Sequence, residues 1–578
     1  MSICWQIFNI MKNSLLLILT LLSLYMTGTA QVVNFEWAIS IVDTTQNIGH
    51  DIAVDSSGNV YTTGTFQGTS DFDPSASTYN LSTMGGIDIF VQKLDSSGNL
   101  LWAAAMGGPS FDKGESIAID ASGNVYTTGS FSGTVDFDPG IGTYNLTSVG
   151  FLRNLFVQKL DASGNFIYAK SIGGASRGLS ITTDLDGNVY TTGSFEEIVD
   201  FDPGAGTYNL TNTGSSDIFV QKWDASGNFI WAKAMTGTSS SSGFDITVDN
   251  LGNVHTTGVF QDTVDFDPSA ATHSLISAGL SDIFIQKLDA SGNFIYTKAI
   301  GGTNSDYGNS IAVDATGNVY TTGHFNDTVD FDPGTGSYNL TSLASAEVFI
   351  LKLDASGNFT WAKSIEGTGY DAASSLALDD TEHIYLAGSF TGTLDFDPSL
   401  GIHNKTSLGA TDAFILKLNS LGDFNWVQTF GGPSWDGVSS LVLNNIGDIY
   451  TTGSFEGIAD FDPDISIFNL MAEGSGYDHD VFVQKLSQSL ITSVRKINIS
   501  PQIKAYPNPT YNLLNIKLDS PARMLKVELI SIHSQILISK TATNSNHIEL
   551  DISSESAGVY FVKITWEDNF EMIKVIKK

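Results

Sequence analysis

The stretch Asp71-Phe72-Asp73-Pro74 occurs seven times in this chain at an almost constant spacing. The copies begin at Asp71, Asp136, Asp200, Asp265, Asp330, Asp395 and Asp460, so the steps between them are 65, 64, 65, 65, 65 and 65 residues. A period this regular indicates equivalent supersecondary units that stack on one another, because insertions between independent units would be free to vary in length. The sequence therefore predicts a repeat array.

Each repeat has the pattern of two β-hairpins that flank the Asp-Phe-Asp-Pro stretch. In the unit that starts at Ser310, strands are expected over residues 310–314, 319–325, 348–353 and 359–365. In turns such as Asp354 to Asn358, the Asp side chain can bond nearby amides and Gly supplies a positive φ. Two hairpins make a four-stranded antiparallel sheet, and apolar residues on both of its faces favour stacked sheets, as in a β-propeller.

The two ends of the array predict a closed ring. The fourth-strand pattern lies inside six units and occurs once more ahead of the first unit, at Asn34 to Ile41, whereas the seventh unit stops after 481–486. The N-terminal strand should therefore complete the last sheet and leave no exposed sheet edge between the ends. We expect an all-β fold, with a seven-bladed β-propeller over residues 31–487 that is closed by an N-terminal strand.

A known repeat family has a similar pattern. Asp-Ala-Ser-Gly-Asn followed by an aromatic-rich strand that ends in Gly-Gly, as at 161–174 and 289–302, resembles the bacterial β-propeller repeats called SBBP repeats. The resemblance implies the propeller architecture. It brings no agreed activity and no catalytic residue.

Charge divides the chain near residue 490. Residues 1–490 carry 16 Lys and Arg against 54 Asp and Glu, a net charge of −38, whereas residues 491–578 carry 11 against 8, a net of +3. An acidic body repels phosphate backbones, so we expect no nucleic-acid partner, while cations, cationic surfaces or neutral glycans remain possible ligands. The charge also serves the solubility of an extracellular protein.

The N-terminus has the features of a secretory signal peptide over residues 1–30, with translation possibly beginning at Met11. Lys12 gives a positive start, 15–26 form an apolar segment, and 28–30, Gly-Thr-Ala, form a small-residue cleavage site. This apolar segment is shorter than the roughly 20 residues that cross a bilayer, and no other stretch reaches that length, so we expect no transmembrane segment in the mature chain. The only cysteine, Cys4, would be removed with the signal peptide.

The C-terminal region has a different pattern. After a linker at 488–500, short strands of a small β-sandwich domain are expected within 501–578, at 515–518, 526–530, 535–540, 547–551 and 559–566. Tyr506-Pro507-Asn508-Pro509 and Ala557-Gly558-Val559-Tyr560 resemble the type IX secretion sorting domain of certain Gram-negative bacteria, although Ser534 stands where that family usually has Gly. The resemblance implies the type IX secretion machinery as a partner and a secreted or cell-surface location.

The Asp-Phe-Asp-Pro stretches are the sharpest candidate for a chemical site. An extended stretch places its two carboxylates on one face about 6 to 7 Å apart, which suits an oxygen-rich Ca²⁺ shell better than a shared proton. In the alternative interpretation the first Asp caps a turn and Phe fills the space between blades. The candidate ion ligands are Asp71, Asp73, Asp136, Asp138, Asp200, Asp202, Asp265, Asp267, Asp330, Asp332, Asp395, Asp397, Asp460 and Asp462.

Each blade also has one lysine in its third strand. These lysines recur beside the acidic pairs, so we expect Lys to Asp ion pairs within or between blades. The residues are Lys93, Lys159, Lys222, Lys287, Lys352, Lys417 and Lys485. Three histidines, His255, His273 and His403, replace tyrosines of the repeat and are expected in aromatic packing positions.

Two functions are compatible with these patterns. Nearly every polar residue recurs in each repeat, whereas catalysis needs one asymmetric group of residues, so we expect a secreted binding or scaffold protein without catalytic residues or a required cofactor. Its partner could be a glycan or a surface protein. The alternative is an exported hydrolase or lyase acting on polysaccharide at the propeller channel. Segments in which the repeats differ, 151–154, 239–242 and 477–480, would distinguish the two if they met around one cleft.

Overall fold

The computed structural model describes residues 31–42, 45–150, 153–463, 466–473, 478–490, 503–531, 536–566 and 569–578. The expected signal peptide at 1–30 and Ser534 lie outside these residues. Of the expected linker, 488–490 continue a strand, and the rest is not described. The chain divides into one compact unit at Val33–Ser489 and a second unit that contains the C-terminal residues.

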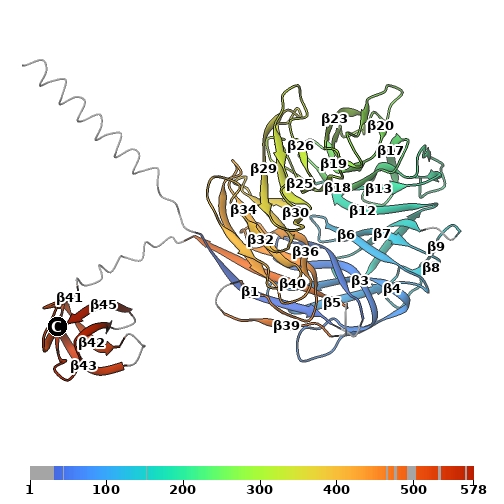
Figure 1. Cartoon of the computed structure of the whole chain (residues 1–578). Helices are drawn as coiled ribbons and strands as arrows, with labels where there is room; N and C mark the ends of the chain where they lie inside the picture. The colour runs from blue at the N-terminus through green and yellow to red at the C-terminus, as the bar shows by residue number, and fades with distance from the viewer. Residues whose placement is uncertain are drawn as a thin grey trace, which may run out of the picture. The chain divides into compact units, whose positions relative to one another are not determined.

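Every helix or strand in the described residues is a β-strand, which confirms the all-β prediction. The larger unit contains seven sheets of four antiparallel strands, which follow one another along the chain (Figure 1). We number them sheets 1 to 7 and count the strands of each sheet from first to fourth.

The first strands are β2 (Ile48–Val54), β6 (Lys113–Ile119), β12 (Ser176–Thr183), β18 (Ser242–Val248), β24 (Tyr307–Val313), β30 (Ala372–Leu378) and β36 (Asp436–Leu443). The second strands are β3 (Val60–Asp71), β7 (Val125–Phe131), β13 (Val189–Phe195), β19 (Val254–Phe260), β25 (Val319–Phe325), β31 (Ile384–Phe390) and β37 (Ile449–Phe455). The third strands are β4 (Asn80–Leu94), β10 (Asn154–Leu160), β16 (Asp217–Trp223), β22 (Asp282–Leu288), β28 (Glu347–Leu353), β34 (Asp412–Leu418) and β40 (Asp480–Leu490). The fourth strands are β5 (Leu100–Met106), β11 (Phe166–Ile172), β17 (Phe229–Gly237), β23 (Phe294–Ile300), β29 (Phe359–Gly367), β35 (Phe424–Phe430) and, in sheet 7, β1 (Gln31–Ile41).

A short crossover hairpin joins the second strand to the third in each sheet. In sheet 1 it continues β3 and β4, which pair from Thr69 with Ser82 to Asp71 with Asn80. In sheets 2, 3, 5 and 7 it is a separate pair of strands: β8 (Thr134–Asp136) with β9 (Asn145–Thr147), β14 (Ile198–Asp200) with β15 (Asn209–Thr211), β26 (Thr328–Asp330) with β27 (Asn339–Thr341), and β38 (Ile458–Asp460) with β39 (Asn469–Met471). In sheets 4 and 6 the hairpin also extends the preceding sheet: β20 (Thr263–Asp265) pairs with β21 (Ser274–Ile276) and with β17, and β32 (Thr393–Asp395) pairs with β33 (Asn404–Thr406) and with β29.

The turns of the two main hairpins use the chemistry expected from the sequence. In sheet 1, Asp95 Oδ1 accepts hydrogen bonds from the amides of Ser97 at 2.8 Å and Asn99 at 3.0 Å, and Asn99 Nδ2 donates to Asp95 Oδ2 at 2.9 Å. Gly98 between them has a φ of 83°, which only glycine adopts without steric cost. The aspartate thus fixes the turn, and the turn fixes the register of the two strands.

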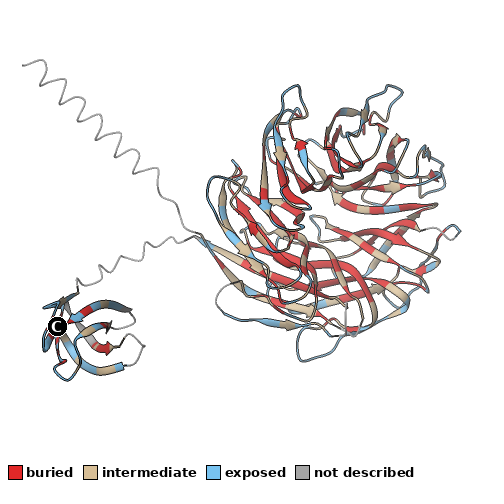
Figure 2. Cartoon of the chain, viewed as in Figure 1, coloured by how far each residue is buried: buried red, intermediate tan, exposed pale blue. Residues whose placement is uncertain are grey.

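The apolar core lies between neighbouring sheets, where both faces of the third strands are covered (Figure 2). All seven residues of β10 are buried. The first strands contact one another in a closed cycle, from β2 to β6, β12, β18, β24, β30 and β36, and β36 contacts β2 again. Covering both faces explains why these strands are apolar throughout and do not alternate with polar residues.

The N-terminal strand β1 pairs with β40, the last strand of the larger unit. Ser487 Oγ donates to Glu36 Oε1 at 2.5 Å, and Trp37 Nε1 donates to the Ser96 carbonyl of sheet 1 at 3.2 Å. Trp102 in β5 makes the equivalent bond at 3.3 Å to the Ala162 carbonyl of sheet 2. The contact from sheet 7 to sheet 1 therefore has the same geometry as the contact between sheets 1 and 2.

The C-terminal unit is one five-stranded sheet: β41 (Lys504–Tyr506), β42 (Leu513–Ile530), β43 (Ile536–Asp551), β44 (Gly558–Trp566) and β45 (Asn569–Lys577). The sequence prediction of a β-sandwich is corrected here, because no second sheet faces this one among the described residues. The long strand β42 pairs with β43 along one side and with β41 and β44 along the other. A bridge from Thr510 to Lys577 brings the two ends of the sheet together, so the sheet curls almost into a barrel around its core.

Candidate functional site

The first Asp of each Asp-Phe-Asp-Pro stretch organises the bend of the crossover hairpin. Asp330 Oδ1 accepts hydrogen bonds from the amides of Asp332 at 3.1 Å and Tyr338 at 2.8 Å. Asp332 Oδ1 in turn accepts from the Gly334 amide at 2.8 Å. The other six copies repeat the two bonds of the first Asp. These carboxylates therefore hold a loop of eight residues together.

The same stretch connects neighbouring sheets. The backbone of Asp330 forms a bridge to Gly301, which follows the fourth strand of the preceding sheet, and Asp71 forms the equivalent bridge to Val42 after β1. Phe331 is fully buried against Phe325 and Phe349, with ring centroids 5.3 and 5.1 Å away. These contacts agree with the interpretation in which Asp caps a turn and Phe fills the space between sheets.

A Ca²⁺ role for the fourteen candidate aspartates remains a prediction. Within the residues that the structure describes, no group of three or more His, Cys, Asp or Glu side chains is arranged to hold a metal ion. In each of the seven stretches the first aspartate already uses one carboxylate oxygen to bind two backbone amides, as Asp330 does. Any ion would need further oxygens from outside the stretch, because Ca²⁺ takes 6 to 8 oxygen ligands.

Among the described residues, six of the seven third-strand lysines form ion pairs, but with other acids than the sequence suggested. Lys159 Nζ lies 3.8 Å from Asp120 Oδ2, in the turn of the first hairpin, and 4.7 Å from the ring centroid of Tyr126. It also donates to the Ala225 carbonyl of the next sheet at 3.0 Å. Lysines 222, 287, 417 and 485 pair with aspartates near the same turn in their own sheets, and Lys352 pairs with Glu382 of the next sheet. The lysines lie at the turn end of the strands, so they do not reach the crossover hairpins at the other end.

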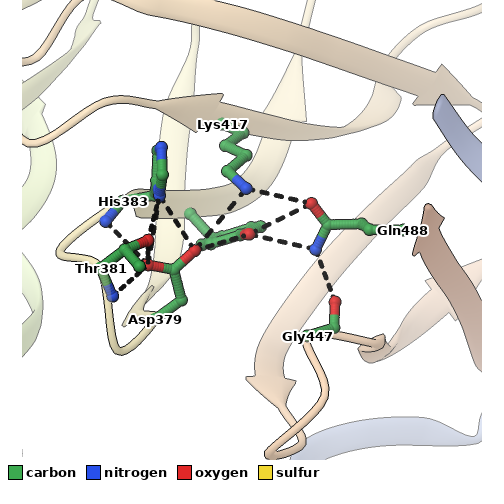
Figure 3. A network of polar contacts seen from close by, with 7 residues as sticks. Asp379, Thr381, His383, Lys417, Gly447 and Gln488 are labelled. Carbon is green, nitrogen blue, oxygen red and sulfur yellow. Dashed lines mark hydrogen bonds and ion pairs between the residues drawn. The ribbon is translucent and has the colours of Figure 1, made fainter. Parts of the chain in front are cut away.

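The contacts of the third-strand lysine differ in sheet 6. The neighbouring sheet 7 has no turn between its third and fourth strands, because these strands are β40 and β1. Lys417 Nζ lies 3.6 Å from Asp379 Oδ2 and donates to Gln488 Oε1 at 3.1 Å (Figure 3). Gln488 Nε2 donates to the Gly447 carbonyl at 2.5 Å. His383 and Thr381 complete the group around Asp379. The side chain of Gln488 thus supplies the acceptor that a turn carbonyl supplies to Lys159.

The histidines occupy aromatic positions, as predicted. His273 lies 4.8 Å from the ring of Phe294 and His403 lies 4.6 Å from that of Phe424, the arrangement that tyrosines have in other sheets. His255 is fully buried beside Asp249 at 3.3 Å. Burial lowers the pKa of His255, so it packs as a neutral ring.

Two carboxylates interrupt a ring of serines on the first strands. Ser116 and Ser440 each donate a hydrogen bond of 2.7 Å to Asp51, and Ser180 and Ser310 each donate one of 2.9 Å to Asp245. Burial raises the pKa of Asp245 to about 6, although these hydrogen bonds lower it in part. Each aspartate ties its strand to the first strands of both neighbouring sheets.

Four pairs of buried acids lie where one sheet meets the next. Each pair joins an acid of a third strand to an acid at the start of the next first strand or just before it, and we call these the acid pairs: Asp88 with Asp112, Asp282 with Asp306, Glu347 with Asp371, and Asp412 with Asp436. Every member is at most 3% exposed. A methyl group on Gly431 would lie 2.9 Å from Asp436 Oδ2 and 3.1 Å from Asp412 Oδ1, so both carboxylates face the same small space.

The acid pairs hold protons at pH values where aspartates are normally ionised. Burial raises the pKa of Asp88 and Asp112 to about 6 and that of Asp436 to about 7, and the neighbouring carboxylate raises the pKa of Asp112 and Asp436 further. Asp88 Oδ1 and Asp412 Oδ1 are buried without a hydrogen-bond partner among the described residues.

Two of the other three junctions replace one acid of the pair by a neutral residue, and the third replaces both. Asn47 Nδ2 donates to Asp480 Oδ1 at 3.0 Å between sheets 7 and 1, and Ser241 faces the junction of Asp217. Between sheets 2 and 3 both positions are neutral, with Asn154 and Ser176. The acids are therefore part of the packing between sheets, and their number differs from junction to junction.

Exposed aromatic rings lie on the connections that lead from a fourth strand to the next first strand. Phe111, Tyr370 and Trp435 occupy equivalent positions, each bridged to the residue before a third strand, and are 55%, 49% and 52% exposed. All connections lie at the end of the strands opposite the hairpin turns, and we call this end the connection face. Tyr370 Oη also lies 3.2 Å from Nε2 of His324, whose pKa burial lowers to about 4.

The described residues of the segments in which the repeats differ lie at three different junctions between sheets. Arg153 lines a cavity of about 290 Å³ with Arg177 and Glu196, and neither 239–242 nor 478–480 contributes to it. Ser240 instead contacts Ser216 of the preceding sheet, and the His479 carbonyl accepts from the Asn47 amide at 2.7 Å. Phe151, Leu152 and Tyr477 lie outside the described residues.

Comparison with known protein families assigns both parts of the chain. A family described as a β-propeller repeat, SBBP, matches residues 42–70 and 278–324, and one described as a secretion system C-terminal sorting domain matches 504–578. The chain thus contains stretches that match SBBP β-propeller repeats and a C-terminal region that matches the sorting domain. The sorting domain marks the propeller for export by type IX secretion to the cell surface or beyond, and implies contact with that machinery. No helix among the described residues is long and apolar enough to cross a membrane.

Curated relatives match the propeller repeats at low identity. An uncharacterized WD repeat-containing protein of Acanthamoeba polyphaga mimivirus is 26% identical over 428 residues, which cover 62% of this chain and 30% of that protein. The regulatory protein FlaEY of Caulobacter vibrioides is 27% identical over 229 residues, covering 38% of this chain and 23% of that protein. The chain thus spans less than a third of the length of these relatives.

Among solved structures, the WD40 repeats of RRP9 align with 79% of this chain and 99% of their own at 9% identity and a TM-score of 0.39. We infer nothing further about the propeller from a similarity at that level.

Sequence reasoning located the motifs of the propeller better than its polar contacts. The structure places the fourteen candidate aspartates in seven separate crossover hairpins and does not bring them together. The acid pairs and the cavity at Arg153 were missed. A signal for the cavity was present, because the single 64-residue step and the segment 151–154 mark the same place in the chain.

Proposed function

We propose that this protein is an exported binding protein, a closed seven-bladed propeller that takes its ligand on the connection face. The sorting domain supports a site of action outside the cell. The cyclic contacts of the first strands and the pairing of β1 with β40 support a closed ring of seven blades. The ligands considered are glycans and surface proteins.

The observation that carries this proposal is the exposure of Phe111, Tyr370 and Trp435 at equivalent positions of one face. Exposing half of a large aromatic ring to water is unfavourable in free energy, and a ligand that covers the ring removes this contact with water. Aromatic residues are also enriched at binding surfaces. Exposed rings also occur on the crossover hairpins, but there the same residue, tyrosine, recurs at Tyr79, Tyr144, Tyr208 and Tyr338, whereas the ring at the connections differs from sheet to sheet. The connections therefore combine variation with exposure, as a binding surface on a rigid scaffold does.

Binding fits this face better than catalysis. Burial lowers the pKa of the His324 imidazole beside Tyr370 to about 4, so near pH 7 it is neutral and a poor general acid or base. The same burial raises the pKa of Tyr370, so its hydroxyl is harder to ionise. A hydrolase or lyase would need an acid and a base with pKa values near the working pH.

A glycan array with the purified full chain tests the proposal. We expect bound glycans, and we expect the variants Tyr370→Ala and Trp435→Ala to lose most of the signal, because these exposed rings supply the contact area. Leu421→Ala is the matched control, since Leu421 is 66% exposed in a hairpin turn at the opposite end of the strands. Equal loss in all three variants, or unchanged binding in both aromatic variants, would exclude the connection face as the binding surface.

A further inference from the structure

One connection of the propeller is shorter than the rest. Met106 and Gly114 are 8 positions apart, as are the equivalent residues at the other connections, whereas Ile172 and Gly178, between sheets 2 and 3, are only 6 apart. Strand register identifies these residues as equivalents, because Gly114 pairs with Gly129 and Gly178 with Gly193. In the shortened connection, Ala175 and Ser176 stand at the positions of Phe111 and Asp112, so this junction has neither the exposed ring nor the buried acid.

Arginine occurs at this connection and nowhere else in the propeller. Residues 31–490 contain two arginines, Arg153 and Arg177. Arg153 takes the place that Ile87 and Ala346 occupy in sheets 1 and 5, since its carbonyl accepts the equivalent backbone bond, from Ser176 N at 3.0 Å. Arg177 pairs across the strand with Ser194, at the position of Tyr307 in sheet 5.

Both arginines line the cavity of about 290 Å³, together with Ser176, Ser194 and Glu196. No hydrogen bond or ion pair joins either guanidinium group to another residue among those that the structure describes. Arg153 lies close enough to Asp112 for its charge to lower the pKa of that carboxyl, and Glu196 lines the same cavity, but neither acid forms an ion pair with an arginine among the described residues. The fixed planar donors of the arginines suit a carboxylate or sulfate, which they can bind through two bonds at once.

The buried groups around the cavity also favour an anion. At four other junctions a carboxylate stands in the third strand and another at the start of the next first strand or just before it, but here the two positions hold the neutral residues Asn154 and Ser176. An acid pair at this junction would neutralise the arginines or repel an anionic ligand. The shortened connection and the neutral residues at this junction thus both favour an anionic ligand beside the arginines.

We infer that this cavity, which we call the arginine pocket, binds an acidic sugar unit, with its carboxylate or sulfate held by Arg153 and Arg177. The inference rests on the proposed binding function and names the chemistry of one ligand. A volume of about 290 Å³ lies at the small end of ligand cavities, which span roughly 300 to 1,000 Å³, so it accepts a single sugar-sized group. Glu196 and Ser194 offer acceptors for sugar hydroxyls beside the cations, a combination that a sugar acid fits better than an acidic peptide side chain.

Isothermal titration calorimetry on the full chain tests the inference with three short probes of equal length: galacturonic acid oligosaccharides, sulfated oligosaccharides and neutral galactose oligosaccharides. We expect at least one acidic probe to bind roughly tenfold or more tightly than the neutral probe, because hydrogen bonds to charged groups are the stronger ones. Added salt should weaken that binding. Preference between the carboxylated and sulfated probes identifies the anion.

Variants separate recognition by the arginines from net charge. Arg177→Gln and Arg153→Gln should each weaken the acidic probe roughly tenfold, while Arg177→Lys keeps the charge, loses the planar fork and should fall in between. Lys405→Gln makes the same change of charge on the exposed crossover strand β33 and should have no effect. Unchanged melting temperatures in all four variants show that the fold is intact.

Equal affinity for acidic and neutral probes, no effect of the arginine variants, or binding of an oligoglutamate in place of the acidic sugars would each overturn the inference. If glycan binding survives in these variants but is lost in Tyr370→Ala, the arginine pocket is refuted while the proposed function stands. If glycan binding is absent throughout, both fail.

Discussion

The acid pair of Asp88 and Asp112 gives a prediction with an unusual sign. Replacing Asp88 by Asn keeps the shape of the side chain and the oxygen that accepts the Met84 amide at 2.7 Å. The new amide nitrogen takes the place of Asp88 Oδ1, which is buried without a partner among the described residues, and can donate to Asp112. The chain already contains this arrangement in reverse, where Asn47 donates to Asp480 at 3.0 Å.

The expected magnitude follows from the pKa of Asp88. Burial raises this pKa from 3.8 to about 6, so below pH 4 the group is protonated in both the folded and unfolded states and carries no penalty. Between pH 3.8 and about pH 6 the carboxyl keeps its proton in the folded state but loses it in the unfolded state. The free energy of unfolding therefore falls as pH rises through this range, and it falls no further above the folded pKa. Two pKa units correspond to about 3 kcal/mol of unfolding free energy, which Asp88→Asn should recover at pH 8.

Denaturant unfolding of the wild type and Asp88→Asn at pH 4.5 and pH 8 measures this effect. We expect the variant to gain about 2 to 3 kcal/mol more at pH 8 than at pH 4.5, with an unchanged dependence on denaturant. Asp480→Asn is the matched control, because its partner is an amide and the substitution breaks an existing bond, so it should destabilise at pH 8. A pH-independent effect of Asp88→Asn, or a loss of stability at pH 8, would refute the reasoning.

Three further predictions concern the repeated contacts. Lys287→Ala should cost about 3 kcal/mol in unfolding experiments, because the side chains of Lys287 and Asp249 are 9% and 7% exposed, while Lys405→Ala, at a partly exposed residue, should stay within about 0.5 kcal/mol; equal effects would show that the pair contributes little. Asp330→Ala removes the acceptor of two amides and should cost about 2 kcal/mol. If these carboxylates hold Ca²⁺, added Ca²⁺ should raise the melting temperature of the wild type and chelation should lower it, and no response to either would exclude the ion. Gln488→Ala should cost about 1 to 3 kcal/mol, since it removes the donor to the Gly447 carbonyl and one acceptor of the buried Lys417, and a neutral result would argue against its role as a turn substitute.

The fold was predictable where local chemistry repeats. Each Asp-x-x-Gly-Asn turn fixes a hairpin by contacts within five residues, so the pattern of Asp95 to Asn99 is legible in sequence. The sheet of the C-terminal unit was harder, because strands such as β42 continue through segments that look like separate short strands. Whether a pair of sheets or one curled sheet forms depends on pairings between residues far apart, such as Thr510 with Lys577.

The polar sites were less predictable because their partners come from different sheets. Lys159 meets an aspartate 39 positions earlier and a carbonyl 66 positions later, and both distances depend on how strands align. Asp88 and Asp112 belong to consecutive repeats, so neither carries a local signal of its partner. The sequence contains one signal for the arginine pocket, the single repeat of 64 residues. The repeat length alone does not show which connection between strands is shorter, so the pocket could not be located from it.

The strand β40 determines how a mechanical load enters the propeller. It leads toward the C-terminal unit and has hydrogen-bonded neighbours on both sides, β37 and β1. A pull along β40 would load both ladders in shear, so many hydrogen bonds must fail together, whereas a pull across an edge strand opens them one at a time. If the propeller is held at a surface by its C-terminal end, a pulling force would enter through a strand that is hydrogen-bonded on both sides. The pairing of β1 with β40 would then resist unfolding when moving fluid pulls on the propeller.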